Sequence, residues 1–361
     1  MSASNGSSRP PRVVLHLVDR STGGVPVAVR GYIANTPPGF SHVVASPHVG
    51  GTPAPVWREG DGKAEIHHVA WEVSTPLRAV RSLRGILRQV DPDVVHAHSS
   101  FPGAYARLLG AGDARLVYTP HCFAFERRDI GAAPRAVYRA IERALRGRAD
   151  VLASGGPGEA VAARGLGYPE DRLRVIPNVP SVHRPASARR PAVRPTRTLT
   201  VGMLGRWAPQ KDPAAFISLV RRLRSELPGV TVRAKWIGGG DGAEGAPDDI
   251  DVTGWQTPDG VATELASLDV YLHTAAWEAA VAIAILDAWE CGIPILARPI
   301  PAMPGLPPMV GVDDGLSGLV EAVRSGRLQD WADDNRARWG GYLDGRFTPQ
   351  SQRTALGRVW G

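Results

Sequence analysis

The sequence predicts an α/β protein with two doubly wound, Rossmann-like domains, and three observations lead to this prediction. The chain has 361 residues, about twice the usual length of one domain. Short, continuous apolar runs recur in both halves, and such runs are typical of parallel strands covered on both faces. Amphipathic stretches with apolar residues every three to four positions lie between several of these runs. This alternation predicts parallel sheets flanked by helices.

The first domain is expected over residues 12–180. Residues 1–11 before it are rich in Ser, Pro and Arg and lack an apolar core, so we expect a disordered tail and not a signal peptide. Apolar residues at helical spacing predict helices over 77–90 and 136–145. The continuous apolar runs predict strands at 13–18, 42–45, 94–97, 116–118, 151–153 and 174–176.

The same alternation restarts after a stretch rich in Pro, Ser and Arg, so residues 181–197 are expected to be a linker. The second domain is expected over 198–345, and the terminal segment 346–361 is expected to be helical from 348 to 360. Two such domains leave a cleft between them, beside the carboxyl ends of their strands. Within the second domain we expect strands at 199–204, 230–237, 252–254, 270–273 and 295–297, and helices at 213–226, 261–267 and 281–290.

Composition and charge exclude several classes of protein. Two cysteines exclude a disulfide scaffold and fit a reducing, cytoplasmic compartment. The longest apolar run, 279–285, is too short to span a membrane. The net charge is +7, but nearly all basic residues are Arg, which indicates a compositional bias. We find no recognition-helix motif or aromatic stacking platform, so no nucleic-acid partner is expected.

Two stretches of the second half are candidates for chemistry. Gly205 ends a predicted strand, and Arg206 and Lys211 flank the Pro-containing loop that leads into the next helix. Two cations beside a helix N-terminus suit a diphosphate, although a solvated loop fits the same spacing equally well. Glu278 precedes a helix that opens with small residues, and Asp287 follows about two turns later, where it could accept ribose hydroxyls. A buried helix with a carboxylate near its start is the simpler interpretation of that second stretch.

Taken together, these stretches resemble the large retaining family four of the GT-B glycosyltransferases, which includes many bacterial sugar and mannosyl transferases. No single stretch is diagnostic, but they occur in the family's order over both halves of the chain. The stretches that carry the resemblance are Gly23-Gly24, Asp93–Ser99, Tyr118–Phe125, Arg174–Asn178, Gly205–Lys211 and Glu278–Pro294.

The resemblance implies a GT-B fold whose domains face a cleft, and a C-terminal helix that crosses back to the first domain. It also implies a role for each matching residue. Arg206 and Lys211 would hold the donor diphosphate together with the backbone of Gly23, Gly24 and Gly205. Glu278 would contact the donor sugar, and His121 would sit beside the sugar in the cleft and donate to or accept from one of its hydroxyls. Asn178 would lie near the hinge. The small residues Ala279, Ala280, Val281 and Ala282 would let the donor approach the helix N-terminus, and Asp287 would replace the glutamate that binds the ribose.

The chain departs from the family's pattern at two positions. Glu278 and Asp287 have eight residues between them where the family usually has seven, and the second residue is a shorter Asp. Alignment on Asp287 places Ala279 where the first glutamate belongs, so either the loop carries an insertion or Glu278 has moved. Asn178 is also followed by Val179 where the family usually has glycine.

The expected activity is sugar transfer from a nucleotide diphosphate sugar, with a UDP-sugar the family's commonest donor, to an unidentified small-molecule, glycan or lipid-linked acceptor. The resemblance implies retention of configuration without a metal, and no cofactor is expected. The acceptor pocket is expected in loops around 24–30, 99–103 and 121–129. Two other classes remain open. One is a nucleotide-sugar epimerase, and the other is a non-catalytic relative that binds a nucleotide sugar or a partner protein.

Some acidic, histidine and arginine patterns could indicate a metal site or a membrane contact, but each has a simpler interpretation. Asp-x-Asp occurs at 91–93 and 249–251, but each lies at the amino end of a predicted strand, the wrong side for a ligand. His96 and His98 share one strand face, and a zinc site would need a third ligand such as His121 or Cys122. Packed or cleft-lining histidines are favoured. Arginines on the helices over 77–90 and 136–145 could contact the inner face of a membrane, although solvated helix faces are slightly favoured.

Overall fold

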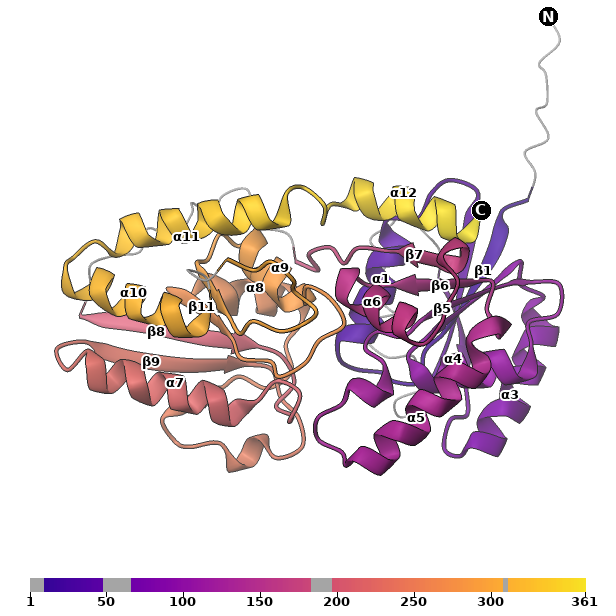
Figure 1. Ribbon diagram of the computed structural model, residues 1–361, viewed down its shortest axis with the longest axis horizontal. Coiled ribbons are helices and arrows are strands. Elements are labelled where there is room, and N and C mark those ends of the chain that lie inside the picture. Colours follow the sequence, from indigo (N-terminus) through magenta and orange to yellow (C-terminus); the bar gives the residue numbers. More distant parts are fainter. Residues whose placement is uncertain (1–9, 48–65, 183–196, 308–310) are drawn as a thin grey trace, which may run out of the picture.

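The computed structural model describes residues 10–47, 66–182, 197–307 and 311–361. They form two lobes, each built around one parallel sheet (Figure 1). The expected tail and linker therefore lie almost wholly outside the described residues. Every strand of the first sheet falls between residues 12 and 175, and every strand of the second between 198 and 297.

The first sheet has seven parallel strands in the order β3-β2-β1-β4-β5-β6-β7. β4 is central, and all five of its residues are buried, which explains its continuous apolar character. The strands are β1 (Arg12–Leu17), β2 (Phe40–Ser46), β3 (Ile66–Ala70), β4 (Val94–His98), β5 (Arg115–Thr119), β6 (Val151–Ser154) and β7 (Leu173–Val175). The helices are α1 (Gly24–Ala34), α3 (Pro76–Val90), α4 (Ser100–Leu109), α5 (Ala132–Leu145) and α6 (Pro157–Gly165), with short 3-10 turns η1 (Ala124–Glu126), η2 (Arg146–Arg148) and η3 (Glu170–Arg172).

The second sheet has five parallel strands in the order β10-β9-β8-β11-β12. Its apolar core lies on both faces, with Trp236 and Phe216 fully buried on one side and Trp339 on the other. The strands are β8 (Thr198–Leu204), β9 (Thr231–Ile237), β10 (Ile250–Val252), β11 (Val270–His273) and β12 (Ile295–Ala297). The helices are α7 (Pro213–Glu226), α8 (Pro258–Ala266), α9 (Ile283–Glu290), α10 (Val312–Arg324) and α11 (Leu328–Leu343), with the turn η4 (Ala243–Gly245).

The last helix, α12 (Pro349–Trp360), crosses back to the first lobe, as the GT-B resemblance implies. Figure 1 shows the yellow end of the chain running from α11, over the second lobe, to α12, over the first. Thr348 caps α12 through the Ser351 amide, and Pro349 occupies its first turn. Leu356, Val359 and Trp360 are fully buried against β1, β4 and β5, so the C-terminus completes the core of the first lobe.

Several expected boundaries are wrong, and among them α5 begins at Ala132 instead of 136 and α8 at Pro258 instead of 261. The helix expected from 281 begins at Ile283, because Ala282 is an extended N-cap residue and the Val281 carbonyl accepts a hydrogen bond from Asn178. The strand expected at 252–254 is β10, two residues earlier. The presumed acceptor loops around 24–30 and 99–103 are mostly the first turns of α1 and α4.

Within the described residues, none of the helices combines the length and the apolar character needed to cross a membrane.

We expect Trp360→Ala to lower the free energy of unfolding by about 3–5 kcal/mol, because it empties a fully buried site between α12 and the first sheet. Arg358→Ala is the matched control, since Arg358 lies exposed on the same helix, and its effect should stay within about 0.5 kcal/mol. Urea unfolding measures both free-energy changes. It is monitored by far-ultraviolet circular dichroism, so that the signal does not depend on the tryptophan removed. Equal effects of the two substitutions would contradict the anchoring role of α12.

Candidate active site

Both sheets reverse their strand order beside their first strand, and this reversal creates the site. β1 lies between β2 and β4, and β8 lies between β9 and β11. In open parallel sheets the loops on either side of such a reversal diverge and leave a crevice at the carboxyl ends of the strands. The loops after β1, β8 and β11 contain Gly23, Lys211 and Glu278. The topology therefore places three of the residues selected from the sequence at these reversal points.

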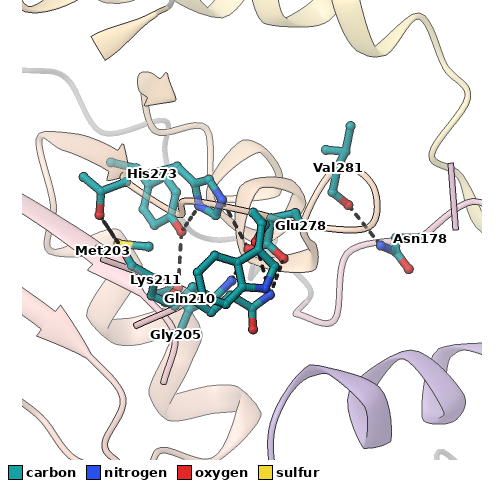
Figure 2. Close-up of polar contacts among 12 residues, drawn as sticks. Asn178, Met203, Gly205, Gln210, Lys211, His273, Glu278 and Val281 are labelled. Atoms are coloured by element: carbon teal, nitrogen blue, oxygen red, sulfur yellow. Dashed lines mark hydrogen bonds and ion pairs between the residues drawn. The ribbon is translucent and has the colours of Figure 1, made fainter. Parts of the chain in front are cut away.

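An ion pair between Lys211 and Glu278 joins the loops after β8 and β11 (Figure 2). The two side chains are only 15% and 12% exposed. Gln210 Nε2 donates to the other carboxylate oxygen at 3.3 Å and to the Trp277 carbonyl at 3.2 Å. His273 Nε2 lies 3.5 Å from Glu278 Oε1, at the end of β11. Glu278 is thus held by three side chains, and its side chain, not Ala279, faces Lys211.

The carboxyl of Glu278 stays ionised although it is buried. Burial opposes ionisation, but the neighbouring Lys211 charge and the contact with His273 outweigh it and lower the pKa of Glu278 to about 2. Burial lowers the pKa of His273, so this imidazole is neutral at pH 7. The pair therefore presents one cation and one anion in a partly desolvated crevice, where their fields are strong.

Gly205 lets Lys211 reach this position. Its φ of 155° is accessible to glycine, and a Cβ there would lie 3.1 Å from the Lys211 stem. Trp236 Nε1 donates to the Gly205 carbonyl at 2.9 Å, which fixes the turn at the end of β8. Asp212 then caps α7 through the Ala215 amide, and Pro213 begins the helix. The glycine and the cap together fold the loop so that Lys211 points toward β11.

Arg206, in the same loop, lies opposite two arginines of the first lobe. Burial lowers the pKa of Arg206, and the nearby charges of Arg20 and Arg127 lower it further. Arg20 follows β1 and Arg127 follows η1, so three cations converge from three loops on one region. Asp129 and Asp241 offset part of this repulsion. Sequence reasoning missed Arg20 and Arg127, because in an arginine-rich chain only the topology distinguishes them.

His121 and Cys122 form a strained turn after β5. Their φ angles are 49° and 84°, a region that residues with a side chain rarely adopt and that often marks functional sites. The Cys122 amide donates to Glu159 at 2.7 Å, and the Gly155 amide donates to the same carboxyl at 2.8 Å. Burial raises the pKa of Glu159 to about 8, although those two hydrogen bonds oppose the rise. Glu159, which sequence reasoning also missed, thereby ties the loop after β5 to the loop after β6.

The two lobes touch through small residues. A Cβ on Gly156 would lie 2.9 Å from the Ala280 side chain, and a Cβ on Gly158 would lie 2.7 Å from the Pro301 carbonyl oxygen. Asn178 Nδ2 donates to the Val281 carbonyl at 3.0 Å across the same junction (Figure 2). Ala279, Ala280, Val281 and Ala282 therefore form the loop that leads into α9, close to the first lobe. Their predicted contact with a donor stays a prediction, as does that of Asn178.

Asp287 faces the segment that leaves the first lobe. Its Oδ1 accepts from the amides of Ser181 and Val182, and its Oδ2 accepts from the Ser181 hydroxyl at 2.8 Å. The residue is only 2% exposed. Burial raises the pKa of Asp287 to about 7, against the effect of those hydrogen bonds. The carboxyl thus anchors the start of the connection between lobes, and ribose binding by Asp287 stays a prediction.

A cleft of about 330 Å³ opens between the lobes beside Glu278. Trp277, Glu278 and the 300–302 loop line it from the second lobe. Arg128, Arg135 and Arg139 line it from the first, together with Phe125 and Glu126. Gly23 lies outside this lining. With a φ of 96° it begins α1 without a side-chain cap, so the first amides of α1 face the end of β1.

The candidate metal ligands are arranged differently from the sequence-based expectation. Asp91, Asp93 and Asp249 precede their strands, as expected, whereas Asp251 lies inside the short strand β10. The third nitrogen near His96 and His98 belongs to His16, and one nitrogen of each lies within 4.8 Å of the others. His16 could not be selected from sequence, because only the pairing of β1 with β4 places it opposite His96.

Two family models match the chain. One, described as "Glycosyl transferase 4-like domain", matches residues 23–179, and the other, described as "Glycosyl transferases group 1", matches residues 198–333. A curated Klebsiella pneumoniae protein, an "uncharacterized 41.2 kDa protein in cps region", is 24% identical over 245 residues. That match covers 63% of this chain, and the chain spans 64% of the length of this relative.

Solved structures of glycosyltransferases share the whole fold. Anabaena HepE, in complex with UDP and glucose, has a TM-score of 0.72 and 13% identity over 96% of this chain and 98% of that one. Sucrose-phosphate synthase of Thermosynechococcus elongatus has a TM-score of 0.72 and 15% identity over 97% and 98%. WaaG, a glycosyltransferase of lipopolysaccharide biosynthesis, has a TM-score of 0.70 and 16% identity over 96% and 100%.

These likenesses and the two facing Rossmann-like sheets define a GT-B fold. The chain belongs to the group 1 glycosyltransferases, since the two family models together match most of it.

We expect Asp287→Asn to flatten the pH dependence of stability. A carboxyl whose pKa rises on folding from 3.8 to about 7 stabilises the folded state fully below pH 4 and loses that contribution as pH rises through 7. An asparagine keeps an acceptor for the Ser181 and Val182 amides but does not titrate. The melting temperature should therefore fall less steeply between pH 4 and pH 8 in this variant than in the wild type.

Asp287→Ala is the control for the anchoring role, because it leaves two amides without their acceptor and should lower the melting temperature at every pH. Some decline should persist in the asparagine variant, since the pKa of Glu159 is raised in the same direction. An unchanged slope in Asp287→Asn would show that the carboxyl titrates normally.

Proposed function

We propose that this protein transfers a sugar from a nucleotide diphosphate sugar, a UDP-sugar in the first instance, to an acceptor hydroxyl with retention of configuration and without a metal. The observation that carries the proposal is the buried Lys211–Glu278 pair beside Arg206, at the strand-order reversal of a group 1 glycosyltransferase. HepE in complex with UDP and glucose, on the same fold, supports the choice of donor.

The cations would stabilise the leaving group. When the bond between the anomeric carbon and the phosphate oxygen breaks, its electron pair stays on the diphosphate. Arg206, facing Arg20 and Arg127, supplies positive charge on one side, and Lys211 supplies it on the other. Charges that are already in place and partly desolvated lower the barrier, because they need no reorganisation as the reaction proceeds. The first amides of α9 add a further favourable dipole.

Glu278 would hold the sugar. Its carboxylate is ionised at neutral pH and already positioned by Lys211 and Gln210, so it can accept hydrogen bonds from sugar hydroxyls. Asp287 would meet a ribose hydroxyl only through the remaining lone pair of Oδ2, because the connection between the lobes occupies its other acceptor sites. The family resemblance requires no strong protein base, and the leaving phosphate is proposed to assist deprotonation of the acceptor.

The acceptor would enter the cleft beside Glu278. Arg128, Arg135 and Arg139 give the first-lobe wall an excess of positive charge, with Arg139 stacked 4.8 Å from the Phe125 ring. This wall suits an acceptor that carries an anionic group, such as a phosphate. A lipid-linked acceptor would in addition bring the protein to a membrane.

Helices α3, α4 and α5 pack side by side and are proposed to make that peripheral membrane contact. They expose five large apolar side chains among their arginines: Leu77, Phe101, Leu108, Val137 and Ile141. Mixed apolar and basic surfaces of this kind bind anionic lipid surfaces.

We expect Arg206→Ala and Lys211→Ala each to reduce turnover at least about tenfold, because each removes a charge from the leaving group. Lys235→Ala is the matched control, since Lys235 forms a comparable ion pair with Glu264 away from the cleft. The assay is release of UDP from UDP-glucose, with and without candidate acceptors, after a thermal-shift screen of nucleotide diphosphates and their sugars.

The same assay separates the alternative functions. Formation of a 2-epimer from the donor would indicate an epimerase. Tight binding of UDP-sugars without turnover in any acceptor screen would indicate a non-catalytic relative. Normal kinetics in both the Arg206 and Lys211 variants would refute the assigned diphosphate site.

We expect Leu108→Glu combined with Ile141→Glu to reduce binding to vesicles that contain about one third anionic lipid, because both residues lie exposed on the proposed contact surface. Trp255→Glu is the control, because Trp255 is an exposed apolar residue of the second lobe. Cosedimentation measures the bound fraction. Equal binding by the double variant and the wild type would argue against this surface.

A further inference from the structure

A continuous chain of hydrogen-bonded imidazoles runs across one face of the first sheet, from the strained turn after β5 to Thr36, just after α1. We define this histidine chain as His121, His98, His16 and His42. His121 Nε2 lies 3.1 Å from His98 Nδ1, His98 Nε2 lies 3.0 Å from His16 Nδ1, and His16 Nε2 lies 3.1 Å from His42 Nδ1. His42 Nε2 reaches the Thr36 hydroxyl at 3.0 Å. Every ring nitrogen of the histidine chain except His121 Nδ1 therefore takes part in one of these hydrogen bonds.

The members of the histidine chain are neutral. Burial lowers the pKa of His42 and of His121 to about 4, and burial together with the neighbouring imidazoles lowers the pKa of His16 and His98 well below the ordinary value. A neutral imidazole has one N–H donor and one acceptor nitrogen. Four neutral rings in series therefore allow only two arrangements, with every N–H pointing toward Thr36 or every N–H pointing toward the cleft.

Thr36 selects one of these arrangements. Its hydroxyl reaches the Pro37 carbonyl at 3.4 Å, and when it donates there its oxygen is left to accept from His42 Nε2 at 3.0 Å. His42 must then carry its proton on Nε2 and accept on Nδ1. The same assignment follows for His16 and His98, each of which carries its proton on Nε2 and accepts on Nδ1. At the end of the histidine chain, His121 donates from Nε2 and leaves a lone pair on Nδ1.

His96 belongs to the same cluster but not to the histidine chain. Trp360 Nε1 donates to His96 Nδ1 at 3.2 Å, so His96 carries its proton on Nε2 and donates to the Thr119 hydroxyl at 2.8 Å. Its tautomer is thus set by α12. Tyr32 is the other titratable group against these rings, stacking on His96 and His121, and Glu159 acts on Tyr32. His96 therefore offers an internal reference with an independent tautomer.

His121 differs from the other members because it is partly exposed, whereas His16, His42 and His98 are fully buried. It is followed by Cys122, whose thiol lies close enough to Glu278 to feel its charge. The open end of the histidine chain thus lies on the side of the first sheet that faces Glu278.

We propose that Thr36, His42, His16 and His98 are positioning residues that hold His121 as the Nε2–H tautomer, so that its Nδ1 lone pair accepts a hydrogen bond from a hydroxyl of the bound sugar. This rests on the proposed function, because it takes the ligand of the cleft to be a nucleotide sugar. A sugar that lacks this hydroxyl would leave the lone pair without a donor, and Thr36, remote from the substrate, would thereby influence donor choice.

The first test needs no ligand and no activity. Protein labelled with ¹⁵N-histidine is examined at pH 7 by ¹⁵N–¹H correlation spectroscopy of the imidazole rings. The chemical shift of each ring nitrogen shows whether that nitrogen carries the proton, and this distinguishes the two tautomers. We expect His121 to be protonated on Nε2. In Thr36→Val, which removes the hydroxyl at a partly exposed position, His121 should populate both tautomers, whereas Thr36→Ser should behave as the wild type and His96 should not change.

Three results would overturn the proposal. One is a wild-type His121 protonated on Nδ1, and another is a Thr36→Val variant whose His121 tautomer is unchanged. The third is stoichiometric binding of added zinc by His16, His96 and His98, reversed by a chelator, because a metal would take the lone pairs that the histidine chain needs.

The second test uses calorimetry with UDP-glucose and analogues that lack one sugar hydroxyl at a time. One analogue should bind wild type and Thr36→Ser about tenfold more weakly than UDP-glucose, and this penalty should shrink to about threefold or less in Thr36→Val. An equal penalty in all three proteins would overturn the role of Thr36 in donor choice. Failure of every UDP-sugar to bind would refute the proposed function instead, and the tautomers measured without ligand would still stand.

Discussion

The parallel direction of every strand is the constraint on which the rest of this structure depends. A parallel sheet delivers all its carboxyl ends to one edge, and a reversal of strand order leaves a crevice at that edge. The loops after β8 and β11 are adjacent only because those strands are neighbours. Lys211 and Glu278, 67 residues apart in sequence, meet for this reason. The two lobes then bring two such edges toward each other, and small residues such as Gly156 and Ala280 allow the close approach.

The charges at these edges are brought together at a cost in electrostatic and desolvation energy. Burial lowers the pKa of Arg206, and repulsion from Arg20 and Arg127 lowers it further. Burial of the Lys211–Glu278 pair also costs desolvation energy, which the attraction between the partners must offset. A ligand with two phosphates would relieve the repulsion among the arginines. The region is therefore better suited to an anion than to solvent, and this electrostatic bias supports the proposed donor site independently of any single residue.

The sequence predicted the fold well because its signals are local. Continuous apolar runs located most strands within a few residues, and Pro213 with Asp212 located the start of α7. The sequence could not predict contacts that depend on strand order. His16 and Arg20 were missed because each belongs to the site only through the pairing of β1 with β4. Asp287 occupies the expected helix, but its hydrogen bonds to Ser181 and Val182 depend on how the lobes are joined.

The buried histidines show how strand pairing can couple side chains that lie far apart, through a series of hydrogen bonds. Apolar residues at 16, 42, 96 and 98 would pack the sheet equally well, and each buried imidazole instead needs two partners. Satisfying them makes the tautomer of each ring depend on its neighbour, so His121 is linked to Thr36 through three other rings. α12 closes this cluster through Trp360, which fixes His96 from the opposite end of the chain. The C-terminal crossing therefore does more than cover apolar surface, since Trp360 also packs against His16, His42 and His96 and donates a hydrogen bond to His96.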